Sequence, residues 1–202
     1  MLERIIKELK KHAPFTFFGA ITGIVIMFLA KNVSFDVSHK IFYTLHPLHV
    51  VLSALVTGSM FKIHHEGKPK IWALILIGYF GSIGIATLSD SIIPYIAETL
   101  LNLPNRGIHL GFIDKWWLVN PLAFLGIAIA YFRPRTKFPH AGHVLLSTWA
   151  SLFHILMAAS GMLNWFSYAV IFFFLFLAVW LPCCVSDIIF PLLFVRKKAG
   201  GK

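Results

Sequence analysis

Hydrophobic residues occur in six long runs along the chain, at residues 14–30, 42–63, 71–101, 116–132, 141–162 and 165–195. As an α-helix, which rises about 1.5 Å per residue, each run is long enough to cross a hydrocarbon core about 30 Å thick. The third and sixth runs are longer than one crossing needs and contain Pro94, Pro182 and Pro191, so we expect kinks or breaks in them. The pattern predicts an all-α membrane protein with six transmembrane helices.

The residues before the first run have a different pattern. In residues 2–12, apolar side chains recur at helical spacing beside lysine and arginine, which predicts an amphipathic helix on the membrane surface. No short apolar core with a small-residue cleavage site is present, so we expect no removable signal peptide. The predicted organisation is an interfacial helix at 1–13, membrane units at 14–103 and 116–195, an external loop at 104–115 and a basic tail at 196–202.

Three short signatures occur twice, once in each membrane unit and in the same order. The copies are 14–19 and 121–126, 46–57 and 140–151, and 89–94 and 186–191. They lie 107, 94 and 97 positions apart, and loop lengths can absorb such differences. We therefore predict an internal duplication. Since each unit has three crossings, the second unit enters the membrane from the opposite side, and inverted repeats of this kind recur in secondary transporters.

The composition supports a membrane location. The chain is 58% hydrophobic and its mean hydropathy is +0.78, more than a soluble domain of 202 residues could bury. The formal net charge is +10, but the basic residues lie between apolar runs, which indicates membrane topology and not nucleic-acid binding. Fourteen of the 18 Lys and Arg residues fall on one side of the predicted membrane. The positive-inside rule therefore places both termini in the cytoplasm. We expect the chain to be integral to the cytoplasmic (inner) membrane.

Each unit combines a histidine pair with a carboxylate inside a predicted span. The histidines are three residues apart, so both rings project from nearly the same face of a helix. A carboxylate inside a membrane is costly and marks a candidate functional site. Imidazoles and a carboxylate together form a ligand set for a divalent transition metal, zinc or iron foremost. The predicted ligands are His46, His49 and Asp90 in the first unit, and His140, His143 and Asp187 in the second.

Nearby hydroxyl side chains are candidate hydrogen-bond partners of these ligands. They are Ser53, Thr57, Ser89, Ser147, Ser151 and Ser186. The two clusters either merge into one central site or form two stations along a pathway. A histidine–aspartate pair can also satisfy itself across two helices without binding an ion.

Two further groups have no counterpart in the repeat. His154 aligns with a methionine in the first copy, so we expect a lone membrane histidine. Cys183 and Cys184 align with alanine and threonine, so we expect both to pack in the core.

The order of histidine, aspartate and proline resembles that of the membrane-bound metal-dependent hydrolases of the LexA-regulated inner-membrane type. The matching residues are His49, Asp90 and Pro94 in the first unit, and His140, His143, Asp187 and Pro191 in the second. The chain departs from the family's Pro-Asp-x-Asp signature, since residues 88–92 are Leu-Ser-Asp-Ser-Ile. It also has His-Ala-Gly-His where the family has His-Arg-Gly-x-Thr-His. The resemblance implies a hydrolytic metal site.

The leading hypothesis is a small membrane transporter or permease for a divalent transition metal ion, with the aspartates compensating the charge of the ion. The alternatives are an intramembrane metal-dependent hydrolase acting on a lipid-linked substrate, a haem b membrane subunit and a structural subunit. The expected partners are the lipid bilayer and the metal ion; a homo-oligomer is left open and nucleic acid is excluded. No phosphate-binding glycine loop, nucleophile elbow or zinc-protease motif is present in the sequence.

Overall fold

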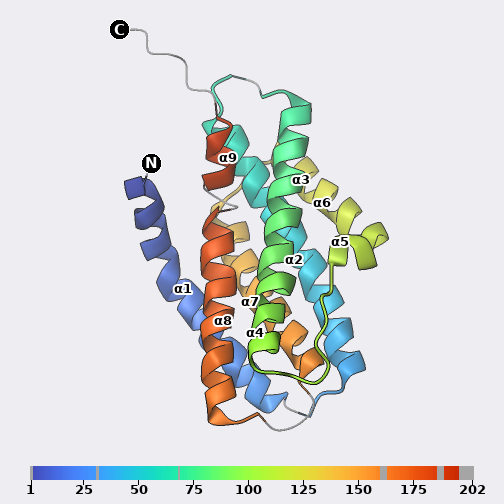
Figure 1. Cartoon of the computed structure of the whole chain (residues 1–202). Helices are drawn as coiled ribbons and strands as arrows, with labels where there is room; N and C mark the ends of the chain where they lie inside the picture. Colours follow the sequence, from blue (N-terminus) through green and yellow to red (C-terminus); the bar gives the residue numbers. More distant parts are fainter. Residues whose placement is uncertain (1, 31, 68, 160–162, 186–188, 196–202) are drawn as a thin grey trace.

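The computed structural model describes residues 2–30, 32–67, 69–159, 163–185 and 189–195 (Figure 1). Within these ranges all regular elements are helical, so the all-α prediction is confirmed. The helices are α1 (Leu2–Leu29), α2 (Phe35–His64), α3 (Ile71–Thr87), α4 (Ile93–Leu100), α5 (Gly111–Asp114), α6 (Trp116–Phe132), α7 (Lys137–Ala158), α8 (Trp165–Cys184) and α9 (Phe190–Leu193). A π-helical turn, η1 (Leu88–Ile92), joins α3 to α4.

Four helical segments in the described ranges are long and apolar enough to cross a membrane. They are Phe35–His64, Ile71–Leu100, Ala141–Ala158 and Trp165–Cys183. The other two predicted runs form shorter apolar helices, Ala13–Leu29 and Trp116–Phe132, so six crossings stay a prediction. These segments are compatible with an integral membrane protein.

The predicted surface helix and the first apolar run form a single helix, α1. Pro14 lies inside α1 and removes one backbone donor without ending the helix. The predicted boundary after residue 13 therefore has no break in secondary structure. In Figure 1, α1 begins and α9 ends toward the same end of the bundle.

The second helix, α2, lies at the centre of the bundle and makes its most extensive contacts with α7, α6 and α3. Glycine lets α6 approach it closely: a Cβ atom on Gly126 would lie 2.4 Å from the backbone oxygen of Val51. A glycine of α3 also allows close packing, since Gly78 lies against Ile127 of α6. This close packing leaves the buried polar face of α2 turned toward η1, α7 and α8.

Candidate metal centre

Asp90 lies in the middle of η1 and is fully buried. The backbone N–H of Ile93 donates to the carbonyl of Leu88, five residues earlier, as in a π-helix. Pro94 has no N–H to donate four residues back, and its ring crowds the carbonyl of Asp90 in a regular α-helix. The wider turn relieves this conflict. The break predicted for the third run thus takes the form of a π-helical turn that carries the carboxylate.

Four side chains donate hydrogen bonds to the Asp90 carboxylate. Oδ2 accepts from Nδ1 of His46 at 2.9 Å and from Nδ1 of His49 at 2.7 Å. Oδ1 accepts from the hydroxyls of Ser89 and Ser147, each at 2.7 Å. A carboxylate only accepts, so both imidazoles carry their proton on Nδ1 and present the lone pair of Nε2. Asp90 therefore orients the two histidines, as carboxylates do for metal-binding histidines.

The predicted cluster of the first unit thus comes together. His46 and His49 project from α2 three residues apart, and both are buried. Nε2 of His49 is buried and has no hydrogen-bond partner among the described residues. A buried polar atom without a partner costs about 1–3 kcal/mol, which a bound ion would offset.

Two residues of the second unit meet His49 in the interior. The rings of His49 and His143 of α7 have centroids 5.4 Å apart. Cys183 of α8 is also buried, and ligand atoms of the three residues all lie within 4.8 Å of one another. Two imidazoles on one tetrahedral zinc ion have centroids about 5 Å apart, given zinc–nitrogen distances of about 2.0–2.1 Å. His49, His143 and Cys183 form a buried group that could hold a metal ion.

The structure describes some, but not all, of the other predicted site residues. Ser151 donates to the carbonyl of Ser89 at 2.9 Å and to that of Ser147 at 2.8 Å, which ties α7 to η1. Ser53 and Thr57 are fully buried on α2. Asp187 and Ser186 lie outside the described residues, and so does the side chain of His140. The described residues of the two predicted clusters meet at the His49–His143 contact and at the hydrogen bond between Ser147 and Asp90.

Sequence reasoning assigned Cys183 to core packing because the first copy has an alanine at that position. The thiol is buried, as expected, but it lies beside two imidazoles. One sequence signal pointed there: Cys183 precedes Asp187 by four residues, one helical turn, and so shares its face. Comparison of the two copies does not reveal Cys183 as a ligand, because a ligand that only one half supplies has no counterpart in the other half.

A second buried pair was not predicted. His154 of α7, expected to be alone, has Nδ1 2.6 Å from Oε1 of Glu98 in α4, and both side chains are buried. Glu98 is close to the end of its apolar run, where sequence reasoning places side chains at the water boundary. The loop after α4 covers Glu98, and Gly107 N–H donates to Oε2 at 3.4 Å.

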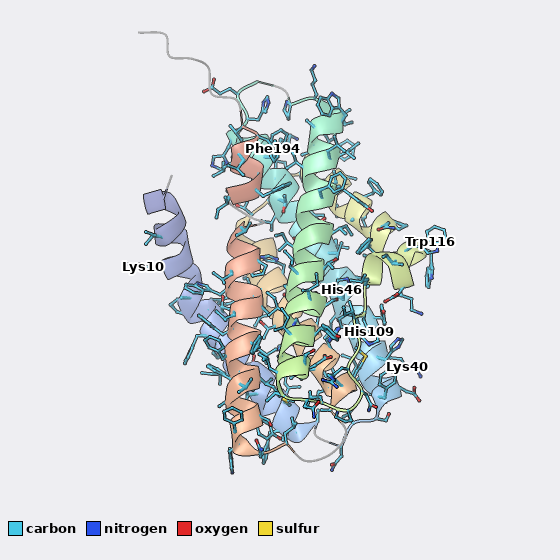
Figure 2. All side chains as sticks on the ribbon, viewed as in Figure 1. Lys10, Lys40, His46, His109, Trp116 and Phe194 are labelled. Carbon is cyan, nitrogen blue, oxygen red and sulfur yellow. The ribbon has the colours of Figure 1, made fainter. Side chains whose placement is uncertain are left out.

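His109 lies beside this pair, with its ring centroid 5.2 Å from that of His154. Burial lowers the pKa of the His109 imidazole, and the neighbouring His154 lowers it further. The lower pKa favours the neutral imidazole, in which one ring nitrogen has an available lone pair. In Figure 2, His46 lies near the middle of the bundle and His109 lies between it and Lys40, toward the end where α2 begins.

No protein-family model matches the chain, and neither the curated proteins nor the solved structures that were compared with it give a match.

Proposed function

We propose that the protein is a small membrane transporter for a divalent transition metal ion, zinc foremost. The observation that carries the proposal is the convergence of His49, His143 and Cys183 from three helices on one buried point. A thiolate with two imidazoles is a donor set typical of zinc, and softer than the donors that Mg²⁺ or Ca²⁺ prefer.

Charge balance favours a divalent ion at this point. A membrane interior disfavours net charge, so a bound cation needs nearby negative groups. The Cys183 thiolate and the Asp90 carboxylate together supply two negative charges. The complex of a divalent ion with these residues is then neutral overall, although Asp90 acts through His49 instead of touching the ion.

The predicted inverted repeat supports transport between two halves. In Figure 1, α1 and α6 run in opposite directions, as do α2 and α7, and α3 and α8. Corresponding contacts recur: the Cβ position of Gly126 lies 2.8 Å from Cβ of Ala54, and that of Gly19 lies 3.1 Å from Oγ1 of Thr148. Gly126 is 107 positions after Gly19, and Thr148 is 94 after Ala54, which are the offsets of the repeated signatures.

The helix break also recurs. Val185 and Ile189 have π-helical geometry, and they lie 97 positions after the two ends of η1. A proline follows at the equivalent place, since Pro191 is the second residue of α9 as Pro94 is the second of α4. Sites between inverted repeats, beside interrupted helices, are characteristic of secondary transporters.

Ion uptake into proteoliposomes tests the proposal. Protein is reconstituted into vesicles that contain a zinc-sensitive dye, and zinc is added outside. We expect uptake by wild-type protein and its loss in Cys183→Ala and His49→Ala. The control is His64→Ala, an exposed histidine at the end of α2 whose Nδ1 lies 2.9 Å from its own helix backbone. Wild-type vesicles that take up no more zinc than empty vesicles would contradict transport.

One observation favours a second function. Within the described residues the group offers three ligands, and catalytic zinc sites have three protein ligands and an open fourth position for water. The second candidate is therefore an intramembrane metal-dependent hydrolase acting on a lipid-linked substrate. It predicts chelator-sensitive hydrolysis in detergent with no zinc uptake, the opposite outcome to that expected of a transporter.

A further inference from the structure

The pair of Glu98 and His154 repeats the chemical arrangement of Asp90 and His49. In both, a fully buried carboxylate lies within hydrogen-bond distance of Nδ1 of a buried histidine on another helix. In both, Nε2 of that histidine is buried and has no hydrogen-bond partner among the described residues. This carboxylate–histidine arrangement fixes the tautomer and aims the free nitrogen at a ligand in metal sites.

His109 supplies a second imidazole at this place. Its ring meets that of His154 at 70° with centroids 5.2 Å apart, close to the separation of about 5 Å for two imidazoles on one tetrahedral ion. The loop that carries His109 is held from both sides. Gly107 N–H donates to Glu98, and Ser91 of η1 donates to the carbonyl of His109 at 2.6 Å.

The surrounding rings connect this place to the surface and to the central group. His39 of α2 is partly exposed, and its ring centroid is 6.1 Å from that of His109. On the inner side, Phe42 meets the ring of His154 edge-on at 5.3 Å and stacks on His46, also at 5.3 Å. His46 shares the Asp90 carboxylate with His49. A line of aromatic rings, all imidazoles except Phe42, thus leads from the end where α2 begins to the metal centre.

We propose that His154, His109 and Glu98 form a second metal-binding station on the path to the central group. His154 and His109 are its ligands, water completes the coordination, and Glu98 is a positioning residue that also compensates charge. The ion is of the same class, a zinc-like divalent cation. Its place on a transport path rests on the proposed function, whereas binding of the ion does not.

Metal binding to the full-length protein in nanodiscs tests the station without any measurement of activity. Zinc is titrated by equilibrium dialysis, and bound metal is counted by elemental analysis. Wild-type protein is expected to bind two equivalents, one tightly and one more weakly. His109→Ala and His154→Gln are each expected to lose the weaker equivalent and to retain the tighter one, while Cys183→Ala loses the tighter one. His64→Ala is the matched control and is expected to bind both.

Cobalt assigns each equivalent to its site. Co²⁺ at the central group gives a thiolate-to-cobalt charge-transfer band, whereas Co²⁺ at a station of imidazoles gives only ligand-field bands. His109→Ala is therefore expected to retain the charge-transfer band and to lose part of the ligand-field absorbance. His109 lies in a loop, so this variant remains informative if His154→Gln does not fold.

The outcomes separate this proposal from the transport proposal. A single equivalent that Cys183→Ala removes and His109→Ala leaves unchanged would overturn the second station and leave transport standing. Two equivalents with no zinc uptake would overturn transport and leave the station standing. No bound metal in the wild-type protein would overturn both.

Discussion

The two carboxylate–histidine pairs of the bundle differ in how completely their carboxylates are hydrogen-bonded. Asp90 accepts from four side chains, and Ser147 among them comes from the second half of the chain. Glu98 has His154 on one oxygen and a loop N–H at 3.4 Å on the other. A carboxylate that accepts hydrogen bonds from four side chains holds those side chains in one arrangement. A carboxylate that accepts from a loop can exchange its hydrogen-bond partners. The comparison favours Asp90 as the fixed centre and Glu98 as the carboxylate of the proposed station, whose partners can exchange.

The largest loss of stability is expected on substitution of Asp90. Asp90→Ala leaves two buried imidazoles and two hydroxyls without their acceptor. A buried donor left without its acceptor costs about 1–3 kcal/mol, so we expect the loss of one acceptor for four donors to lower the unfolding free energy by more than any single hydrogen bond would. Thermal unfolding in detergent measures it. Glu98→Gln is the comparison and is expected to lose less, because the amide oxygen still accepts from one of the two donors that face Glu98. Equal losses in the two variants would remove the distinction between them.

The second effect is on metal affinity alone. Cys183→Ala removes a proposed ligand with little change in volume, so the fold should be retained. Losing a hydrogen-bonding partner of a ligand typically lowers metal affinity by about 10–100-fold, and losing the ligand itself should lower it further. Zinc titration with a competing chelator measures the change. An affinity within a factor of about two of wild type would show that the thiol only packs.

Sequence reasoning succeeded where local spacing decides contact. His46 and His49 lie three residues apart and so share a face of α2, and Pro94 sets the break that carries Asp90. The contact between the two elements was predicted because a carboxylate inside a membrane is costly without a partner. Within the described residues each of the six apolar runs contains a helix, and the run 116–132 has the bounds of α6. The sequence does not decide whether the two predicted clusters merge, because the depth of each cluster in the membrane depends on helix tilt and packing. Cys183 and Glu98 were missed for the same reason, since only tertiary contact reveals their partners.

A smaller effect is expected from a glycine that lies against the centre. A Cβ atom on Gly111 would lie 2.5 Å from the His46 ring, so Gly111→Ala must displace that ring or α5. Overpacking of this kind costs about 1–3 kcal/mol. Because His46 is not in the metal-binding group, we expect zinc affinity to fall by less than in Cys183→Ala. Gly84→Ala is the matched control, since its Cβ meets nothing within 4 Å in the described structure. Loss of metal binding as complete as in Cys183→Ala would move His46 into the ligand set.

The smallest expected effect concerns the hydrogen bond from Ser147 to Asp90, which joins the two halves of the chain. Ser89 and Ser147 both donate to Oδ1 of Asp90 at 2.7 Å, but Ser89 precedes Asp90 in η1 while Ser147 belongs to α7. Replacing either serine by alanine removes one hydrogen bond, so we expect each to lower unfolding free energy by about 1 kcal/mol. Only Ser147→Ala also loosens α7, which carries both His143 and His154.

The two serine variants are expected to have similar stability but different zinc affinity. A bond that holds α7 against η1 keeps His143 near His49, so Ser147→Ala should weaken zinc binding more than Ser89→Ala does. Titration of both variants beside the wild type measures the difference. Equal affinities in the two variants would mean that packing and the Ser151 bond to η1 hold α7 without the Ser147 bond, and that Asp90 orients the two histidines of its own half without linking the halves.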